Sequence, residues 1–156
     1  MICIAAILSI IACTAPANMS APPTTEEIDK VVDTGRWDFR ANQMIPNYGS
    51  SKPVSAEYSV IFNPKRMVVY LPYSGRSETA INTDPTKGPL DFTSLNFSVE
   101  KQQRKPGEWH ITIVPRDNPE IRSMSFVFYD NGNGNLDVMF SGRSGVSFRG
   151  TVVYYK

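Results

Sequence analysis

The chain has 156 residues, enough for one domain that buries most of its unfolded surface without disulfides or metals. Hydrophobic residues make up 41% and charged residues 20%, which excludes a bulk that is disordered or membrane-spanning. Sixteen basic and fifteen acidic residues leave a net charge of +1, which argues against a nucleic-acid partner because phosphate recognition needs a basic excess. Twelve prolines and 11% aromatic residues favour a β-rich fold with many turns.

Residues 1–12 are predicted to be a secretory signal peptide. The opening, MICIAAILSIIAC, is apolar and uncharged, and it is shorter than the roughly 20 residues that span a bilayer. It ends in Ile10-Ile11-Ala12-Cys13, which resembles the lipobox of bacterial lipoproteins. In a lipobox the cysteine thiol takes a diacylglycerol, and the new amine is then acylated by a chain such as palmitate. We therefore expect Cys13 to be the lipid attachment site that anchors the protein in a membrane.

Two further expectations concern this end of the chain. A secretory signal normally opens with Lys or Arg, and none is present, so we expect the coding sequence to start upstream. Cys3 would leave with the signal, so the lipidated chain could form no disulfide. The alternative interpretation is a buried N-terminal strand or helix with an incidental cysteine.

Residues 13–23 are predicted to be a lipidated tether. They contain three prolines, small polar residues and no charge, a composition from which a packed core cannot be built. An acidic run that would mark export to the cell surface does not follow the cysteine. We therefore expect the remaining chain, a single β-rich domain over residues 24–156, to face the periplasm.

A short helix is predicted over residues 25–34. Thr24 and Glu27 have the spacing of a capping box. Ile28, Val31 and Val32 fall on one apolar stripe, and Gly35 is a natural terminator. We expect this helix to lie across one end or the concave face of the sheet, and we predict no second helix.

From Trp37 onward the hydrophobic period changes to two, which indicates antiparallel strands with one face buried. The alternating sets, one for each predicted strand, are Trp37/Phe39/Ala41, Tyr58/Val60/Phe62, Met67/Val69/Leu71, Leu95/Phe97/Val99, Trp109/Ile111/Ile113, Met124/Phe126/Phe128, Leu136/Val138/Phe140 and Val146/Phe148/Val152/Tyr154. Turn residues stand between many of them, at 63–65, 105–107, 130–135 and 141–145. The longer loops are 46–55 and 77–89.

These elements predict a mainly β fold, an antiparallel meander of about eight strands that forms a strongly curved sheet or a partly closed barrel, with one N-terminal helix. The predicted core is the set of inward-facing positions. Its members are Phe62, Val69, Leu71, Phe97, Trp109, Ile111, Phe126, Phe128, Val138 and Phe148.

The sequence gives little support for a catalytic or a metal-binding site. The single histidine, His110, lies between Trp109 and Ile111, which claim the core face, so we expect it on the solvated face. No Gly-x-Ser-x-Gly elbow is present to support a catalytic triad. The stretch DNGNGNLD at 130–137 has glycine where a calcium loop places oxygen ligands, so a hairpin turn is the preferred interpretation. We therefore predict no catalytic residue, no metal site and no cofactor.

Three stretches together resemble a known family. They are Leu71-Pro72-Tyr73-Ser74-Gly75-Arg76, Gly88-Pro89-Leu90-Asp91-Phe92 and residues 143–150, RSGVSFRG. Their order and spacing resemble the bacterial domain-of-unknown-function family 4251, found mostly in secreted or lipid-anchored proteins of gut Gram-negative bacteria. The resemblance covers about residues 25–154. It implies a location in the cell envelope and a fold, and no activity.

One constellation within these stretches is a candidate ligand rim. Tyr73 and Arg76 would place a ring and a guanidinium at a strand end, suited to an anionic or sugar ligand. The alternative is structural, with Pro72 and Gly75 shaping a bend and Tyr73 packing across it.

The sequence thus favours a lipid-anchored envelope protein that binds or scaffolds without catalysis, with an unidentified protein or small-ligand partner. The alternative is a hydrolase acting on envelope or dietary polymers. A cleft with two close carboxylates would favour that alternative.

Overall fold

The computed structural model describes residues 25–75 and 88–154, which form one helix and ten strands. The helix is α1 (Thr25–Thr34). The strands are β1 (Trp37–Pro46), β2 (Lys52–Pro53), β3 (Ser59–Asn63), β4 (Arg66–Tyr70), β5 (Asp91–Ser94), β6 (Phe97–Lys105), β7 (Glu108–Pro115), β8 (Ile121–Tyr129), β9 (Asn133–Phe140) and β10 (Val146–Tyr154).

The strands form a single antiparallel sheet that follows a meander with one interruption. Its order is β5-β4-β3-β1-β10-β9-β8-β7-β6, with β2 pairing only with β1. Strands that follow one another along the chain are therefore paired from β3 to β5 and from β6 to β10. The exception is the β5–β6 connection, whose two strands are the opposite edges of the sheet, while β1 pairs with β10.

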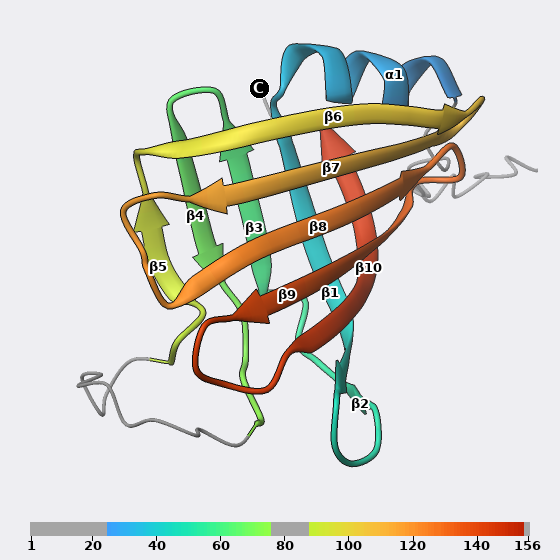
Figure 1. Cartoon of the computed structure of the whole chain (residues 1–156). Helices are drawn as coiled ribbons and strands as arrows, with labels where there is room; N and C mark the ends of the chain where they lie inside the picture. Colours follow the sequence, from blue (N-terminus) through green and yellow to red (C-terminus); the bar gives the residue numbers. More distant parts are fainter. Residues whose placement is uncertain (1–24, 76–87, 155–156) are drawn as a thin grey trace, which may run out of the picture.

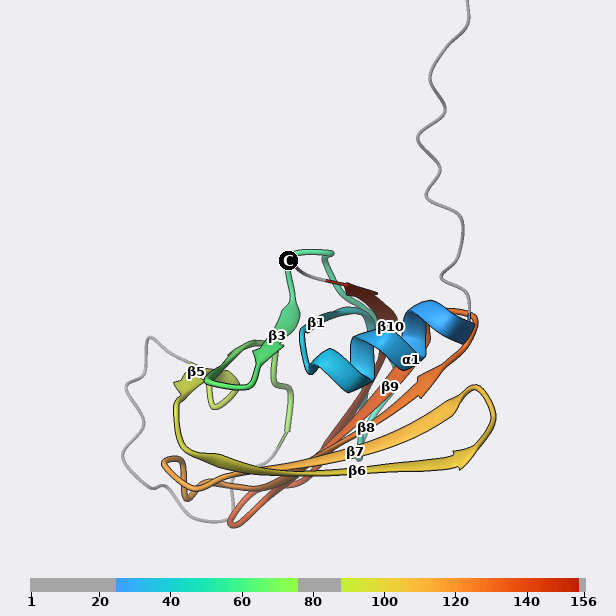
Figure 2. The same cartoon turned by 90° about the horizontal axis from the view of Figure 1, so that it is seen from above.

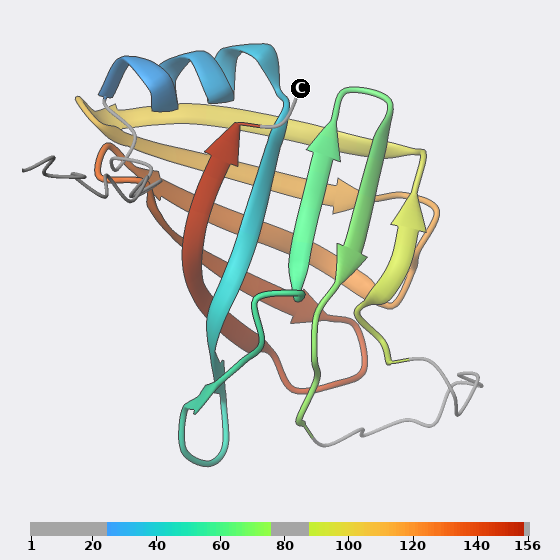
Figure 3. The ribbon, with the colours of Figure 1, turned by 180° about the vertical axis from the view of Figure 1, so that it is seen from behind.

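The sheet curls back over itself as a half-barrel with two layers. Strands β1, β3 and β4 cross behind β6, β7 and β8 in Figure 1, with β5 at the left edge of the view, and the view from behind shows the same crossing (Figure 3). The long, bent strand β10 leads from one layer to the other. Two sheet layers that cross in this way enclose their inward-facing side chains as a common core.

Helix α1 covers one end of the space between the layers (Figure 2). Its stripe of Ile28, Val31 and Val32 is buried, and Gly35 ends it with φ +62° and an N–H bond to the Val31 carbonyl of 3.1 Å. Strand β6 also holds the helix, because Lys101 Nζ donates a hydrogen bond to the Val32 carbonyl at 2.7 Å.

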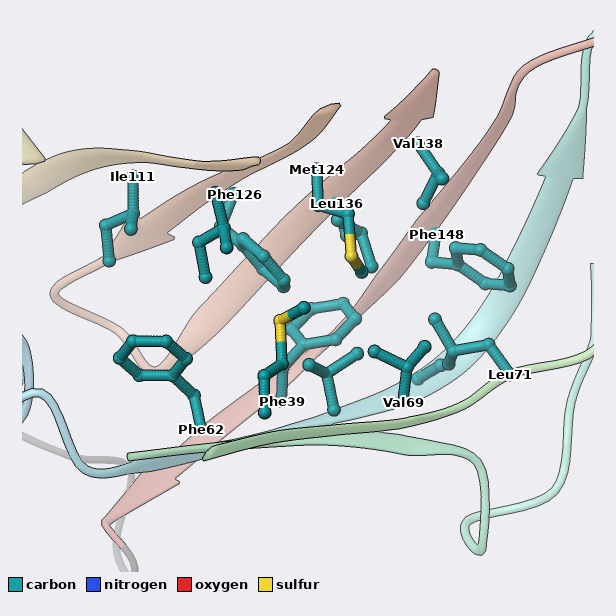
Figure 4. Close-up of a cluster of buried hydrophobic side chains, with 14 of the residues drawn as sticks. Phe39, Phe62, Val69, Leu71, Ile111, Met124, Phe126, Leu136, Val138 and Phe148 are labelled. Carbon is teal, nitrogen blue, oxygen red and sulfur yellow. The ribbon is translucent and has the colours of Figure 1, made fainter. Parts of the chain in front are cut away.

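The core consists of side chains from both layers (Figure 4), to which the helix adds Ile28, Val31 and Val32. Trp37 is at its centre, 1% exposed. Its ring centroid lies 4.9 Å from that of Phe62 in its own layer, and 4.9 Å and 5.1 Å from those of Phe126 and Phe128 in the opposite layer. These edge-to-face and stacked contacts add to the apolar area that the two layers bury.

A carboxylate fixes the corner between β5 and β6. Asp117 accepts hydrogen bonds from the Ser94 hydroxyl at 2.5 Å, from the Leu95 N–H at 2.7 Å and from the Asn96 N–H at 3.1 Å. The Ser94 hydrogen bond is the largest cause that holds the pKa of Asp117 below its ordinary value, followed by the backbone N–H groups, with burial acting in the opposite direction. The chain thereby leaves one layer and enters the other within two residues.

The predicted fold class is confirmed, and so are the helix bounds and its buried stripe. All eight predicted strands are present, with two further strands. Strand β2 lies inside the predicted 46–55 loop, and β5 follows the 77–89 loop. Strand β2 has two exposed residues and β5 has a single large apolar residue, Phe92, so neither has the alternation of several apolar residues from which a strand is recognised.

The predicted core is confirmed for eight of its ten members. Phe97 and Trp109 are only partly buried, although both pack against the core. The prediction that Leu95 and Val99 lie on the buried face of their strand is wrong, because these residues are 69% and 37% exposed. The physical reason is their position, since Leu95 stands in the corner held by Asp117 and Val99 lies on β6, the last strand of the sheet.

Candidate functional site

The outer face of strands β6–β10 is polar. Along β8, β9 and β10 the inward residues are buried and alternate with exposed or half-buried ones. The outward residues include hydroxyls, amides and charges, with few large apolar side chains. Within the described part of the chain, this face has a hollow near β1 and another near β6.

We call the first one the amide hollow, and its volume is about 550 Å³. It lies over four strands that are neighbours in the sheet, β1, β10, β9 and β8. Its lining is Asn42, Gln43, Tyr129, Asn131, Asn133, Gly134, Asn135, Arg149 and Gly150. Five of these nine residues carry a side-chain amide, which both donates and accepts hydrogen bonds.

Much of this hydrogen-bonding capacity is unused within the described part of the chain. Asn135 Nδ2 donates to Tyr129 Oη at 3.3 Å, Asn131 Oδ1 accepts the Asn133 N–H at 3.0 Å, and Gln43 Nε2 donates to the Ser51 hydroxyl at 3.2 Å. The side chains of Asn42 and Asn133 make no hydrogen bond among the described residues. An amide offers about four hydrogen-bonding positions, so the hollow presents donors and acceptors to a ligand.

Arg149 is the one charged residue among the described residues that line the amide hollow. It is exposed, and none of the ion pairs between described residues involves it. Its position on the outer face follows from the alternation of β10, since the adjacent Phe148 and Gly150 are buried. A guanidinium in this setting offers up to five N–H donors in a fixed, planar arrangement.

We call the second one the charged hollow, of about 590 Å³, over β6, β7 and β8. Its lining is Glu100, Lys101, Gln102, Arg104, His110, Thr112, Ser125, Phe126 and Val127. His110 is 34% exposed and faces outward as predicted, with its Nε2 at 2.8 Å from Glu108 Oε1. Lys105 Nζ lies 2.9 Å from Glu108 Oε2. The hydrogen bonds to His110, first, and to Lys105 hold the pKa of Glu108 below its ordinary value.

The charged hollow brings a histidine near two hydroxyls, but they are not joined. His110 makes its hydrogen bond to Glu108, and among the described residues no hydrogen bond links it to Thr112 or Ser125. A nucleophile activated by a base requires these two groups within hydrogen-bond reach. The hollow therefore has the residue types of a catalytic site without the contact that would couple them.

The two hollows are connected by the register of the sheet. One row of cross-strand partners runs across the outer face from one hollow to the other. It consists of Gln102, His110, Val127, Asn135, Arg149 and Gln43. Adjacent strands lie about 4.8 Å apart, so the row from β6 to β10 spans about 19 Å.

The predicted ligand rim is only partly described. Tyr73 donates its hydroxyl hydrogen to the Ser144 carbonyl at 2.9 Å, and its ring packs edge-on against Phe140 at 5.0 Å. A Cβ at Gly75 would collide with the Tyr73 ring and hydroxyl, so only glycine allows this arrangement. The LPYSGR stretch thus contacts the RSGVSFRG stretch. Arg76 and the predicted lipid site Cys13 lie outside the described residues.

The stretch DNGNGNLD forms the predicted hairpin. Gly132 has φ +77° and its N–H bonds to the Tyr129 carbonyl at 3.0 Å, so the chain reverses between β8 and β9. Within residues 25–75 and 88–154 no group of three or more His, Cys, Asp or Glu side chains is arranged to hold a metal ion. The one helix of the described chain is not long and apolar enough to cross a membrane.

The amide hollow was not predicted from the sequence. Part of it can be recognised in the sequence. Three of its asparagines belong to the DNGNGN turn, and the alternation of β10 places Arg149 on the outer face. Asn42 and Gln43, however, join it through the pairing of β1 with β10, whose register shifts between Ala41 and Gln43. An irregularity of this kind in a pairing between distant strands cannot be derived from local periodicity.

Comparisons with known proteins agree with the fold. The family model described as Domain of unknown function (DUF4251) matches residues 22–152. A crystal structure of a DUF4251 family protein from Bacteroides eggerthii DSM 20697, at 1.95 Å resolution, is similar in fold, with a TM-score of 0.56 and 15% sequence identity over 83% of this chain and 87% of that one. No curated protein matches the chain. The chain belongs to the DUF4251 family.

Proposed function

We propose that this protein is a lipid-anchored module of the bacterial cell envelope that binds a ligand without transforming it. The binding surface is the outer face of β6–β10, and the amide hollow is its centre. The core between the two sheet layers is occupied by side chains of the protein itself, among them Trp37, Phe126 and Phe148. A ligand is therefore expected on the outside of the sheet.

One observation carries this proposal. The amide hollow is lined by amides, one phenol and one guanidinium, with no carboxylate, imidazole, thiol or aliphatic hydroxyl among the described lining residues. Amides and guanidinium groups hold a ligand by hydrogen bonds, whereas general acid–base or nucleophilic chemistry needs groups that exchange protons or attack. This set of groups favours recognition over hydrolysis.

The location rests on the N-terminal sequence and on the family resemblance. Cys13 follows an apolar segment that ends in Ile-Ile-Ala, and the tether at 13–23 would separate the domain from the membrane surface. The protein would face the periplasm.

Fractionation tests the anchor: the wild type should remain with membranes and carry acyl chains on Cys13, whereas Cys13→Ser should be released. An unmodified Met1 at the native N-terminus would contradict it.

The binding role is tested by presenting the full chain in detergent with panels of envelope polysaccharides, dietary polysaccharides and peptides. An Asn135→Trp variant should fill the amide hollow and abolish binding. Arg66→Trp adds the same ring at an exposed position of β4 and should leave binding unchanged. Recovered polymer should have its original length. Polymer shortened by the wild type would instead establish the hydrolase alternative.

A further inference from the structure

The amide hollow has a definite electrostatic character. Among its described lining residues Arg149 is the single cation, and no acid is present. On the adjacent outward row, Asp137 accepts a hydrogen bond from the Ser147 hydroxyl at 2.5 Å. An unpaired guanidinium attracts a carboxylate most strongly, because the two groups form parallel, charge-assisted hydrogen bonds.

The uncharged lining residues indicate which uncharged groups the ligand carries. Each amide can donate to one group and accept from another, and a sugar hydroxyl is complementary to it because a hydroxyl does both. The phenol of Tyr129 adds a half-buried ring beside these amides. A phosphodiester chain would need several cations in the hollow, and it offers one. A peptide strand would bind a sheet edge through backbone hydrogen bonds, and the hollow lies on a sheet face.

The register row extends this site. From Arg149 it passes Asn135 and Val127 to His110 and Gln102, and Arg104 lines the charged hollow at the far end. A cation thus lies at each end of a row of about 19 Å whose members are polar except for Val127, and Glu100 lines the far end beside Arg104. This length suits a chain of sugars that carries carboxylates at intervals.

We propose that the outer face of β6–β10 binds a uronic-acid-containing polysaccharide, with one carboxylate on Arg149 and sugar hydroxyls on the amides of Asn42, Asn133 and Asn135. This inference rests on the proposed function, since it names the ligand class of the same surface.

The test measures binding of the full chain in detergent by calorimetry. The probes are oligogalacturonate, its fully methyl-esterified counterpart, which has the same sugars without charge, and oligomers of alginate and hyaluronan. The wild type should bind at least one of the acidic oligomers, and esterification of the galacturonate should weaken binding at least about tenfold.

Variants locate the carboxylate site. Arg149→Gln should weaken binding to the acidic oligomers at least about tenfold, and Arg149→Lys should restore only part of it because a lysine lacks the planar pair of donors. Arg66→Gln, at an exposed position of β4 outside this face, changes the net charge equally and should leave binding unchanged. The unfolding midpoint of each variant should equal that of the wild type, which shows that the change acts on the site.

Three results overturn the inference. Equal binding of the acidic and esterified oligomers would show that the ligand is neutral, and unchanged binding by Arg149→Gln would place the ligand elsewhere. No binding to any of the three acidic oligomers would exclude uronic-acid chains. In each case binding to another member of the polysaccharide or peptide panels, blocked by Asn135→Trp, would leave the proposed function standing. Conversely, tight binding of oligogalacturonate accompanied by its cleavage would confirm the ligand class and refute the non-catalytic role.

Discussion

The two faces of strands β7–β10 differ sharply although the same four strands provide both. On the inner face one register row joins Ile111, Phe126, Leu136, Phe148 and, on β1, Met44, all buried. The neighbouring outer row joins His110, Val127, Asn135, Arg149 and Gln43. Successive side chains of a strand point to opposite faces, so each residue belongs to one row only.

This difference separates stability from recognition. The inner row determines whether the layers pack, and its members are constrained in volume. The outer row contributes little to packing, so its chemistry can change while the fold persists. Substitutions on the inner face should therefore lower the free energy of unfolding, and substitutions on the outer face should alter binding alone. Variants of the two faces test this separation.

Removal of the helix should have the largest effect because α1 covers one end of the inner face. Deleting residues 14–35 exposes the core and removes three buried aliphatic side chains, which contribute about 1.5–3 kcal/mol each. The Trp109–Asp29 hydrogen bond of 2.6 Å is lost with it. We expect aggregation or unfolding, measured by light scattering and urea denaturation. Deleting only 14–22 is the control. Equal stability of the two truncations would mean that the sheet closes its own core.

Truncation of an inner-row aromatic should follow. The Phe126 ring is 1% exposed, and its centroid lies 4.9 Å from that of Trp37 and 5.8 Å from that of Phe39. Phe126→Ala should lower the free energy of unfolding by about 3–5 kcal/mol, as expected for a buried ring. Val127→Ala, one residue along the same strand, is the matched outer-face control and should have a much smaller effect. A larger loss from Val127→Ala would reverse the assignment of the two faces.

These two experiments concern features that the sequence predicted well. The stripe of Ile28, Val31 and Val32 and the alternation around Phe126 are local patterns, and local patterns report which side of an element is buried. The position of the strands in the sheet is not local. The pairing of β1 with β10, and the break between β5 and β6, depend on contacts between residues far apart in the chain.

The errors have the same origin. Leu95 has the spacing of a buried strand residue, but Asp117, which lies 22 residues further along, binds its N–H and turns the chain at that point. The amide hollow likewise needs Asn42 and Arg149 together, which only the sheet register provides. Sequence reasoning can therefore identify the inner face of this fold, whereas the outer site requires the structure.

The corner at Asp117 should have an intermediate effect because it joins the two layers without lying in the core. Asp117→Ala removes the acceptor of two backbone N–H groups and leaves the buried Ser94 hydroxyl only its longer contact with the Asn96 carbonyl at 3.3 Å, so it should lower the free energy of unfolding by about 2 kcal/mol. The pKa of Asp117 is lowered in the folded protein, so its stabilisation is present above the unfolded pKa of about 3.9 and is lost as the pH falls through the folded pKa.

The pH dependence provides the control for this prediction. Asp117→Asn keeps the side-chain shape and does not titrate, so its stability should fall less than that of the wild type between neutral pH and the acid range. Urea denaturation at several pH values measures the difference. An identical acid profile for the two proteins would mean that the ionised carboxylate does not hold the corner.

The smallest effect is expected at His110, on the outer row. Its contact with Glu108 joins two side chains at the surface of the sheet, and Lys105 still pairs with Glu108 when the imidazole is removed. His110→Ala should therefore change the free energy of unfolding by no more than about 0.5 kcal/mol. If the surface recognises its ligand without catalysis, the variant should also leave any polymer at its original length, as the wild type does. A wild type that cleaves a polymer, with activity lost in His110→Ala and stability unchanged, would show that this row performs chemistry. The outer face would then be a catalytic surface. The inner face would still determine stability, and the outer face would perform catalysis in place of binding alone.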